Sequence, residues 1–154
     1  MLTICQLLIF VTYVAYITNR FGVLPSISES HYKLNESRQG YFFTIFCWAL
    51  STTMVLEADN SSPFYFYSGV GLGFVGTATH FKWTDSYTPI IHYLGAFVGI
   101  VCAFIGLYDQ SNMWVPAAIF AFITAIFVLF KIKNAIFWIE IVAFLLIIIG
   151  LFLR

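Results

Sequence analysis

Charged side chains are scarce in this sequence. Seven lysines and arginines and seven aspartates and glutamates make up 9% of its 154 residues, whereas 61% are hydrophobic. An average soluble domain carries about 25% charged residues, so this chain cannot cover a surface that faces water. The composition therefore excludes a soluble enzyme, a secreted disulfide scaffold, a disordered tail and a nucleic-acid binder. The class of protein that remains is an integral membrane protein.

Cysteine is also rare, and its placement indicates no special chemistry. Cys5, Cys47 and Cys102 fall in three different apolar runs, where free cysteine behaves as a small hydrophobe. Their spacing matches no metal site, so we expect no metal and no cofactor. No lysine or arginine precedes the first apolar run, and no small-residue cleavage site follows it before Asn19. We therefore expect this run to be a retained membrane helix and not a cleaved secretion signal.

Six long apolar runs lie between breaking residues. A spanning helix takes about 20 residues for a hydrocarbon core about 30 Å thick. Runs such as WVPAAIFAFITAIFVLF are apolar on all sides, unlike the alternating strands of a membrane β-barrel. The sequence therefore predicts an all-α, polytopic membrane protein with six transmembrane helices in one domain. The predicted spans are residues 1–18, 41–57, 63–79, 88–108, 113–130 and 135–154.

Basic residues are distributed unequally between the two sides of this topology. The odd-numbered connections contain Arg20, Lys33, Arg38, Lys82, Lys131 and Lys133, whereas only Arg154 lies on the opposite side. Short loops rich in lysine and arginine face the cytoplasm in most membrane proteins. We therefore predict that the odd-numbered connections are cytoplasmic and that both termini lie outside.

Glycines recur at helical spacing in the third and fourth spans. The two stripes are Gly69, Gly73 and Gly76, and Gly95, Gly99 and Gly106. Because small residues let membrane helices approach closely, we expect these spans to form an antiparallel hairpin with the two stripes facing each other. Each stripe extends to a histidine, so the hairpin would bring His80 and His92 together at the cytoplasmic end. Alternatively, the histidines only anchor the headgroup region or bond to a neighbouring helix.

Glu140 lies about five residues into the last predicted span. A carboxylate at that depth is costly unless it is paired, protonated or beside water. One hypothesis places it in a polar cluster with His80 or His92. A second pairs it with Lys131 or Lys133, and a third puts it in contact with another subunit.

The first connection combines an apolar start with a polar continuation. We expect residues 21–27 to lie at the membrane interface, followed by the hydroxyls and carboxylate of Ser26, Ser28 and Glu29. On the predicted topology one side of the membrane collects Ser26, Ser28, Glu29, His31, His80, Asp85, His92 and Glu140. Such convergence is expected of a binding site and also of any short cytoplasmic rim.

Three short segments carry a family resemblance. They are PSISE at residues 25–29, GTATHF at residues 76–81 and HYLGAF at residues 92–97. Over about residues 20–110 the chain resembles the six-helix DRAM and Sfk-type family, which shows P-x-I-S-D, G-x-x-x-A-N-F and H-D-x-G-A-F in this order. It departs from that pattern at Glu29, His80 and Tyr93.

The resemblance implies a role connected with membrane lipids. Relatives of that type act in lipid-anchor remodelling, phosphoinositide regulation and autophagy, and they supply no catalytic residue to carry over. The family places its first connection outside the cytoplasm, opposite to the orientation that the basic residues of this chain predict.

The leading hypothesis is a non-catalytic membrane protein with a polar pocket on its cytoplasmic side. The third, fourth and sixth spans would form this pocket, the first connection would cover it, and a lipid headgroup or a membrane partner would bind there. The histidines would orient the headgroup, while Lys82 and Arg38 would contact its phosphate. The candidate ligand-binding residues are His80, His92, Glu140, Glu29, Ser28, Asp85, Lys82 and Arg38.

Three other functions are compatible with parts of the pattern. A metal-dependent lipid hydrolase would use His80 and His92 with Asp85 or Glu29 as ligands, and Glu140 as its base. A proton or ion pathway would use the same groups, although the outer halves of the spans carry almost no polar residues. An accessory subunit of a larger complex, or a homo-oligomer, would use the apolar faces of the last two spans.

Overall fold

The computed structural model describes residues 1–59, 61–78 and 87–153, with the backbone alone for residues 87–89. In this part of the chain all regular structure is helical, which confirms the predicted all-α class. The helices are α1 (Leu2–Phe21), α2 (Glu29–Asn35), α3 (Tyr41–Ala58), α4 (Phe64–Ala78), α5 (Tyr87–Ser111), α6 (Val115–Leu129) and α7 (Ala135–Leu153). Six of them correspond to the predicted apolar spans, and the short helix α2 was not predicted.

Four helices are long and apolar enough to cross a membrane. Among the described residues these are Leu2–Phe21, Tyr41–Ala58, Ile90–Ser111 and Ala135–Leu153. Helices α4 and α6 have 15 residues each, or about 22 Å at 1.5 Å per residue, which is less than the roughly 30 Å of a hydrocarbon core. The helix lengths thus agree with an integral membrane protein that has four candidate spanning helices among the described residues.

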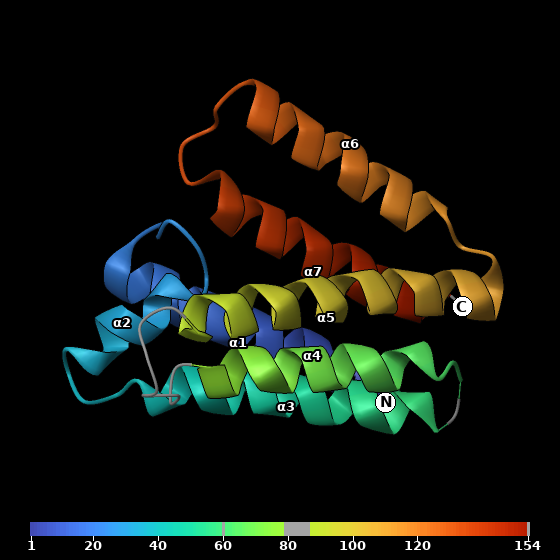
Figure 1. Cartoon of the computed structure of the whole chain (residues 1–154), viewed down its shortest axis with the longest axis horizontal. Helices are drawn as coiled ribbons and strands as arrows, with labels where there is room; N and C mark the ends of the chain where they lie inside the picture. The colour runs from blue at the N-terminus through green and yellow to red at the C-terminus, as the bar shows by residue number, and fades with distance from the viewer. Residues whose placement is uncertain (60, 79–86, 154) are drawn as a thin grey trace.

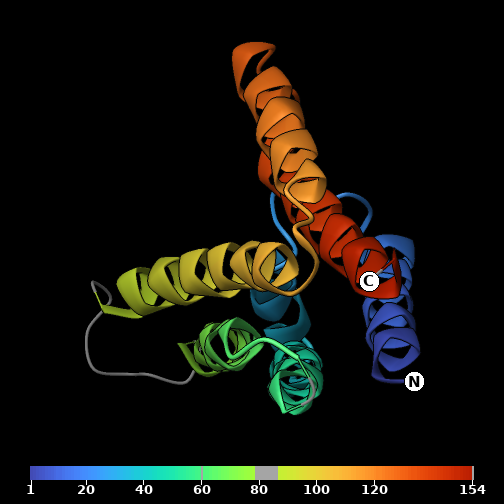
Figure 2. The same ribbon diagram turned by 90° about the vertical axis from the view of Figure 1, so that its right-hand side faces the viewer.

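The helices form two groups, α3 to α5 and α6 with α7. The groups contact each other through α5 and α7, and α1 contacts both. Helices α3, α4 and α5 lie side by side, and α1 packs against α3 and α7 (Figure 1). Helix α6 packs against α7 and projects away from the remaining helices (Figure 2). Both termini lie toward one end of the long axis, opposite α2 (Figure 1).

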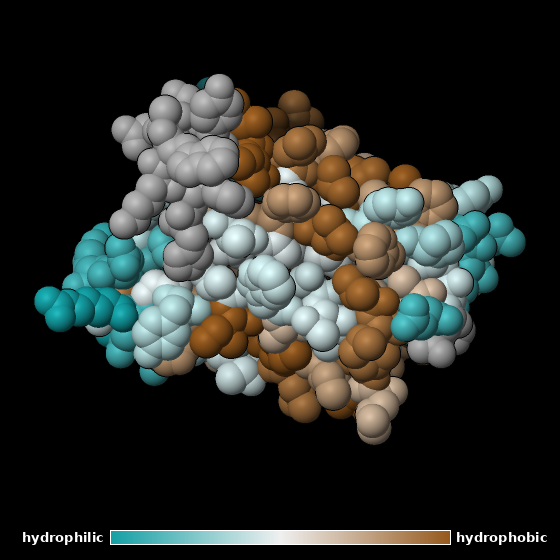
Figure 3. Space-filling model, turned by 60° about the horizontal axis from the view of Figure 1, so that its bottom comes forward, coloured by the Kyte–Doolittle hydropathy of each residue, from teal (hydrophilic) through white to brown (hydrophobic). Residues whose placement is uncertain are grey.

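The surface agrees with a membrane environment. On the face drawn in Figure 3, hydrophobic side chains are concentrated across the middle of the molecule, and hydrophilic surface lies toward both ends of its long axis. Large apolar side chains such as Leu8, Ile45 and Phe97 are more than half exposed. Exposed apolar surface of this extent is normal where lipid, and not water, surrounds a protein.

The glycines of α4 face two different neighbours. A Cβ added at Gly69 would lie 2.7 Å from the carbonyl oxygen of Ser51 in α3, and one added at Gly76 would lie 2.7 Å from Cβ of Cys47. Gly73 also faces α3. The prediction that the stripe of Gly69, Gly73 and Gly76 faces the stripe of α5 is therefore wrong.

The close contact between α4 and α5 is made by Gly71. A Cβ there would lie 2.6 Å from the backbone oxygen of Gly95 and 2.6 Å from the backbone nitrogen of Gly99. Residues two positions apart are about 200° apart around a helix of 3.6 residues per turn. Gly71 therefore lies on the side of α4 opposite Gly69 and Gly73, and α4 is lined with glycine on both sides because it lies between two helices. Gly106 of α5 packs against the ring of Tyr65.

Hydroxyl groups bond across these close helix contacts. Ser51 donates to the carbonyl of Gly69 at 2.6 Å, and Ser68 donates to the carbonyl of Gly99 at 2.7 Å. Thr44 donates to the carbonyl of Gly76 at 3.2 Å. Hydrogen bonds between helices stabilise membrane bundles, so these three fix α4 between its neighbours. Thr52 and Thr53 instead bond to backbone carbonyls within their own helix, as hydroxyls inside a helix commonly do.

Candidate functional site

The first connection is docked onto the start of α7 by three hydrogen bonds. The backbone N–H of Ile27 donates to Oε2 of Glu140 at 2.5 Å. The backbone N–H of Phe137 donates to the carbonyl of Pro25 at 3.1 Å. The side-chain amide of Asn134 donates to the carbonyl of Val23 at 2.9 Å. Residues 23–27, which we call the docked segment, therefore lie along one face of α7.

Local sequence features explain this docking. Phe137 is in the first turn of α7, where backbone N–H groups have no partner within the helix, so its N–H is available to Pro25. Asn134 precedes the helix with a positive φ of 56°, a conformation that asparagine tolerates better than most residues. Leu24 and Ile27 anchor the segment, since they are only 6% and 3% exposed. These two side chains belong to the protein core, and the expectation that the segment lies at the depth of the membrane interface stays a prediction.

A second set of hydrogen bonds ties the docked segment to α1 and α2. Ser30 donates to the carbonyl of Ile27 at 2.5 Å, and its hydroxyl also bonds to that of Tyr13 at 2.6 Å. The Ser26 hydroxyl accepts from the backbone N–H of Glu29 at 3.1 Å. Ile27 therefore has both backbone polar groups satisfied, one through Ser30 and one through Glu140.

A cavity of about 50 Å³ lies directly behind the docked segment. It is large enough for several water molecules or one small polar group. Its polar lining comes from Ser28 of the first connection, His92 of α5 and Glu140 of α7. The remaining lining is mostly apolar and consists of Ile27, Phe43, Phe46, Cys47, Leu50, Leu72, Val75, Ala96, Ile100 and Phe144. The cavity thus presents few polar groups in an apolar enclosure, as small-ligand sites commonly do.

Glu140 and His92 each make a hydrogen bond within the described protein, and each keeps a further polar atom for a ligand. Among the described residues, Ile27 provides the hydrogen bond to the Glu140 carboxylate, through Oε2, which leaves Oε1 available to a ligand. The half-buried ring of His92 bonds to the backbone of Val75 and lies edge-on to the ring of Tyr93, with centroids 5.7 Å apart. An imidazole has two nitrogens, so within the described residues His92 retains a second one for a ligand.

The structure brings together three of the eight predicted site residues. Ser28, His92 and Glu140 line one cavity. Glu29 is half-buried beside Ser28 but does not line the cavity, and Arg38 is exposed and also does not line it. A phosphate in this cavity would therefore not meet Arg38 as predicted. The remaining three, His80, Lys82 and Asp85, lie outside the described residues, as does the predicted pairing of His80 with His92.

Glu140 does not form the salt bridge that one hypothesis proposes. In the residues that the structure describes, the one ion pair joins Lys33 to Glu36, so Glu140 pairs with neither Lys131 nor Lys133. Among the same residues, no group of three histidine, cysteine, aspartate or glutamate side chains is close enough to hold a metal ion.

The contacts that build the site were not predicted from the sequence. They are the hydrogen bonds of the Asn134 side chain and of the Phe137 backbone, and the bond between Tyr13 and Ser30. One signal was present: an asparagine directly before an apolar run is a typical start of a helix, and such an end offers free N–H groups to a neighbouring segment. The segment that accepts them is not identifiable from local sequence.

No protein family model, no curated protein and no solved structure matches this chain. The resemblance to the DRAM and Sfk-type family therefore stays a prediction.

Proposed function

We propose that this protein is a non-catalytic integral membrane protein whose cavity, lined by His92 and Glu140, binds the headgroup of a membrane lipid. The observation that carries the proposal is that these two side chains, from different helices, line one largely apolar cavity together with Ser28. Polar and ionisable groups at membrane depth commonly mark a binding site. The docked segment covers this site from one side.

The chemistry of the lining favours a headgroup that donates hydrogen bonds. Glu140 offers a carboxylate oxygen, which only accepts when it is ionised. A phosphate group beside the ionised carboxylate would be repelled, since like charges in a low dielectric destabilise each other. An ammonium or hydroxyl group would instead donate to Glu140, while Ser28 and His92 orient it. We therefore infer that the site binds the amine of an aminophospholipid such as phosphatidylethanolamine.

The proposal includes a bilayer position for all six apolar helices. Helix α4 lies between α3 and α5 along its length (Figure 1), and α6 forms a hairpin with α7. Bilayers thin locally around short apolar helices at modest cost, so 15-residue helices fit within a bundle of longer ones. The basic residues then place the first, third and fifth connections in the cytoplasm.

A matched pair of lipids tests the proposed site. Phosphatidylethanolamine and phosphatidylcholine carry the same net charge, but only the first has N–H donors. The delipidated protein should be stabilised more by phosphatidylethanolamine, measured as a shift of the thermal unfolding midpoint in detergent. His92→Phe should remove the difference while the protein still folds, and the exposed control Glu36→Gln should keep it. Equal shifts with both lipids in the unchanged protein would overturn the proposal.

One observation favours a second candidate function, that of a subunit in a larger membrane complex. Helix α6 has no buried residue, although Thr124 is its one polar side chain, and Phe122 and Leu129 are 68% and 76% exposed. A photoreactive amino acid in place of Phe122 in native membranes tests this candidate. Cross-links to one defined protein would support it, and cross-links to lipid alone would contradict it.

A further inference from the structure

A second hollow, separate from the cavity, lies between α1 and α3. It is an open groove of about 680 Å³, within the size range of small-ligand sites. Its wall on α1 includes Leu8 and Thr12, and its wall on α3 includes Phe42 and Ile45. Leu8 and Ile45 are 61% and 57% exposed, so the groove is open along the surface that would face lipid.

One end of this groove is polar, and a cation lies next to it, bonded to two of the lining residues. Tyr16 and Gln39 both line the groove, and both bond to Arg20. The guanidinium of Arg20 donates to the Tyr16 hydroxyl at 2.6 Å and to Oε1 of Gln39 at 2.5 Å. It also lies 5.9 Å from the ring centre of Tyr16 and 5.3 Å from that of Phe21. These contacts hold the charged group at the end of the groove.

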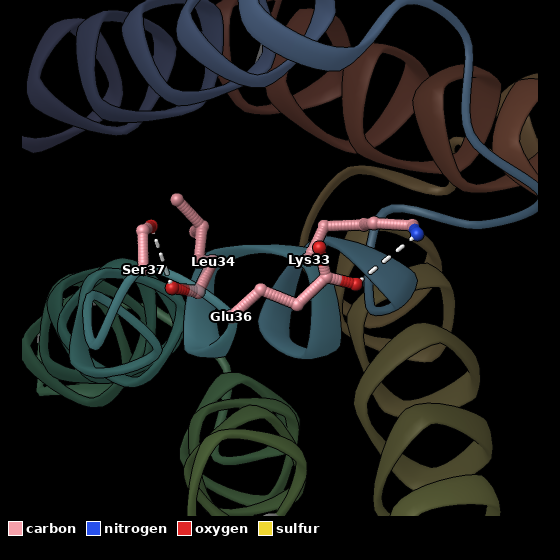
Figure 4. Close-up of polar contacts among 4 residues, drawn as sticks. All are labelled: Lys33, Leu34, Glu36 and Ser37. Atoms are coloured by element: carbon pink, nitrogen blue, oxygen red, sulfur yellow. Dashed lines mark hydrogen bonds and ion pairs between the residues drawn. The ribbon is translucent and has the colours of Figure 1, made fainter.

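The charge of Arg20 is not compensated by an acidic side chain in the described part of the chain. Its third hydrogen bond goes to the Ser37 hydroxyl at 3.1 Å, so all three acceptors are neutral. The Ser37 hydroxyl itself donates to the carbonyl of Leu34 at 2.9 Å (Figure 4), which turns its oxygen lone pairs toward Arg20. The nearby carboxylate of Glu36 is paired with Lys33 at 3.3 Å (Figure 4) and does not neutralise Arg20.

We propose that this groove binds an anionic phospholipid, with one acyl chain along the apolar walls and the phosphate on Arg20. A guanidinium has five N–H donors in a planar fork that matches phosphate, and three of the five are engaged by described residues. The net negative charge of the lipid complements the uncompensated cation, and the apolar walls match an acyl chain. This site and the cavity of Glu140 have opposite preferences, since one attracts an anion and the other a hydrogen-bond donor.

Titration with two lipids of identical acyl chains tests the proposal by native mass spectrometry. Phosphatidylglycerol has a net negative charge, whereas the charge of phosphatidylcholine is balanced internally. The unchanged protein should bind phosphatidylglycerol more tightly than phosphatidylcholine. Arg20→Gln should weaken phosphatidylglycerol binding about tenfold, as expected for the loss of a charge-assisted hydrogen bond, and should remove the preference. The control Arg38→Gln removes an exposed arginine of the same connection and should change neither result.

A second variant tests the acyl-chain part without touching the charge. Leu8→Trp would fill the groove from an exposed position, so it should weaken phosphatidylglycerol binding although Arg20 is retained. His92→Phe, which alters the other site, should leave this binding unchanged, so the two proposals can fail independently. Phosphatidylglycerol binding that survives both Arg20→Gln and Leu8→Trp would overturn the proposal.

Discussion

The carboxylate of Glu140 accepts a hydrogen bond from the backbone N–H of Ile27, with 2.5 Å between nitrogen and oxygen. This bond joins the first connection to the last helix. It gives the carboxylate of α7 a structural partner, and it gives the backbone N–H of the buried Ile27 an acceptor. The same carboxylate lines the cavity, so one residue both holds the docked segment and shapes the proposed site.

Replacing Glu140 should therefore affect stability in a way that depends on the replacement. Glu140→Leu leaves the Ile27 N–H buried without an acceptor, which costs about 1–3 kcal/mol. Glu140→Gln retains an acceptor oxygen and should cost less. The free energy of unfolding in mixed micelles measures both, with Glu36→Gln as an exposed control. A Leu variant as stable as the Gln variant would contradict the structural role of the bond.

Asn134 combines a hydrogen bond with a backbone conformation that favours asparagine or glycine. Asn134→Ala loses the bond to Val23 and also places alanine at a φ of 56°, which costs about 1 kcal/mol more. Asn134→Gly loses the bond but adopts that φ freely. We expect the alanine variant to be the less stable of the two, by thermal unfolding in detergent. If the glycine variant were the less stable of the two, Asn134 would not have the left-handed backbone conformation.

The contact between α4 and α5 can be tested with two glycines that face it. A methyl group at Gly71 would meet backbone atoms 2.6 Å away, whereas one at Gly99 would have its nearest neighbours at 3.5 Å. Backbone atoms cannot give way, so Gly71→Ala should destabilise the protein by about 1–3 kcal/mol. Gly99→Ala should be close to neutral, because alanine favours a helix and fits the space. Equal stabilities, measured by chemical unfolding, would contradict the described packing.

Hydroxyl bonds between helices should each contribute modestly. Ser51→Ala and Ser68→Ala remove bonds to carbonyls of a neighbouring helix, and such bonds in membranes contribute about 0.6 kcal/mol on average. Thr52→Ala is the matched control, because Thr52 bonds within its own helix. Unfolding free energies should fall for the two serine variants more than for the control. A larger loss in the Thr52 variant would show that the crossing bonds do not stabilise the bundle.

The helices were predictable because apolar runs and their breaking residues are local features. All six apolar runs correspond to helices, with ends that differ from the predicted ones by at most three residues. The short helix α2 was missed, since its seven residues carry little periodicity. The number of helices that are long enough to cross a membrane depends on where each helix ends. Sequence patterns locate helix ends only to within a few residues.

The partners of individual residues were less predictable, because they depend on how helices are arranged in space. Glycine spacing indicated close packing, but it could not tell that Gly69 faces α3 and that Gly71 faces α5. Glu140 was recognised as exceptional from its depth in an apolar run. Its acceptance of a backbone N–H from Ile27 had no sequence signal, since every residue of the first connection except Pro25 offers that group.

Native mass spectrometry of the protein gently extracted from membranes tests the central claim most directly, because it weighs the protein together with the lipid it retains. The account predicts an aminophospholipid bound to the unchanged protein, and its loss from a folded His92→Phe variant. An aminophospholipid retained equally by both proteins, or absent from the unchanged one, would contradict the claim that His92 and Glu140 form a headgroup site.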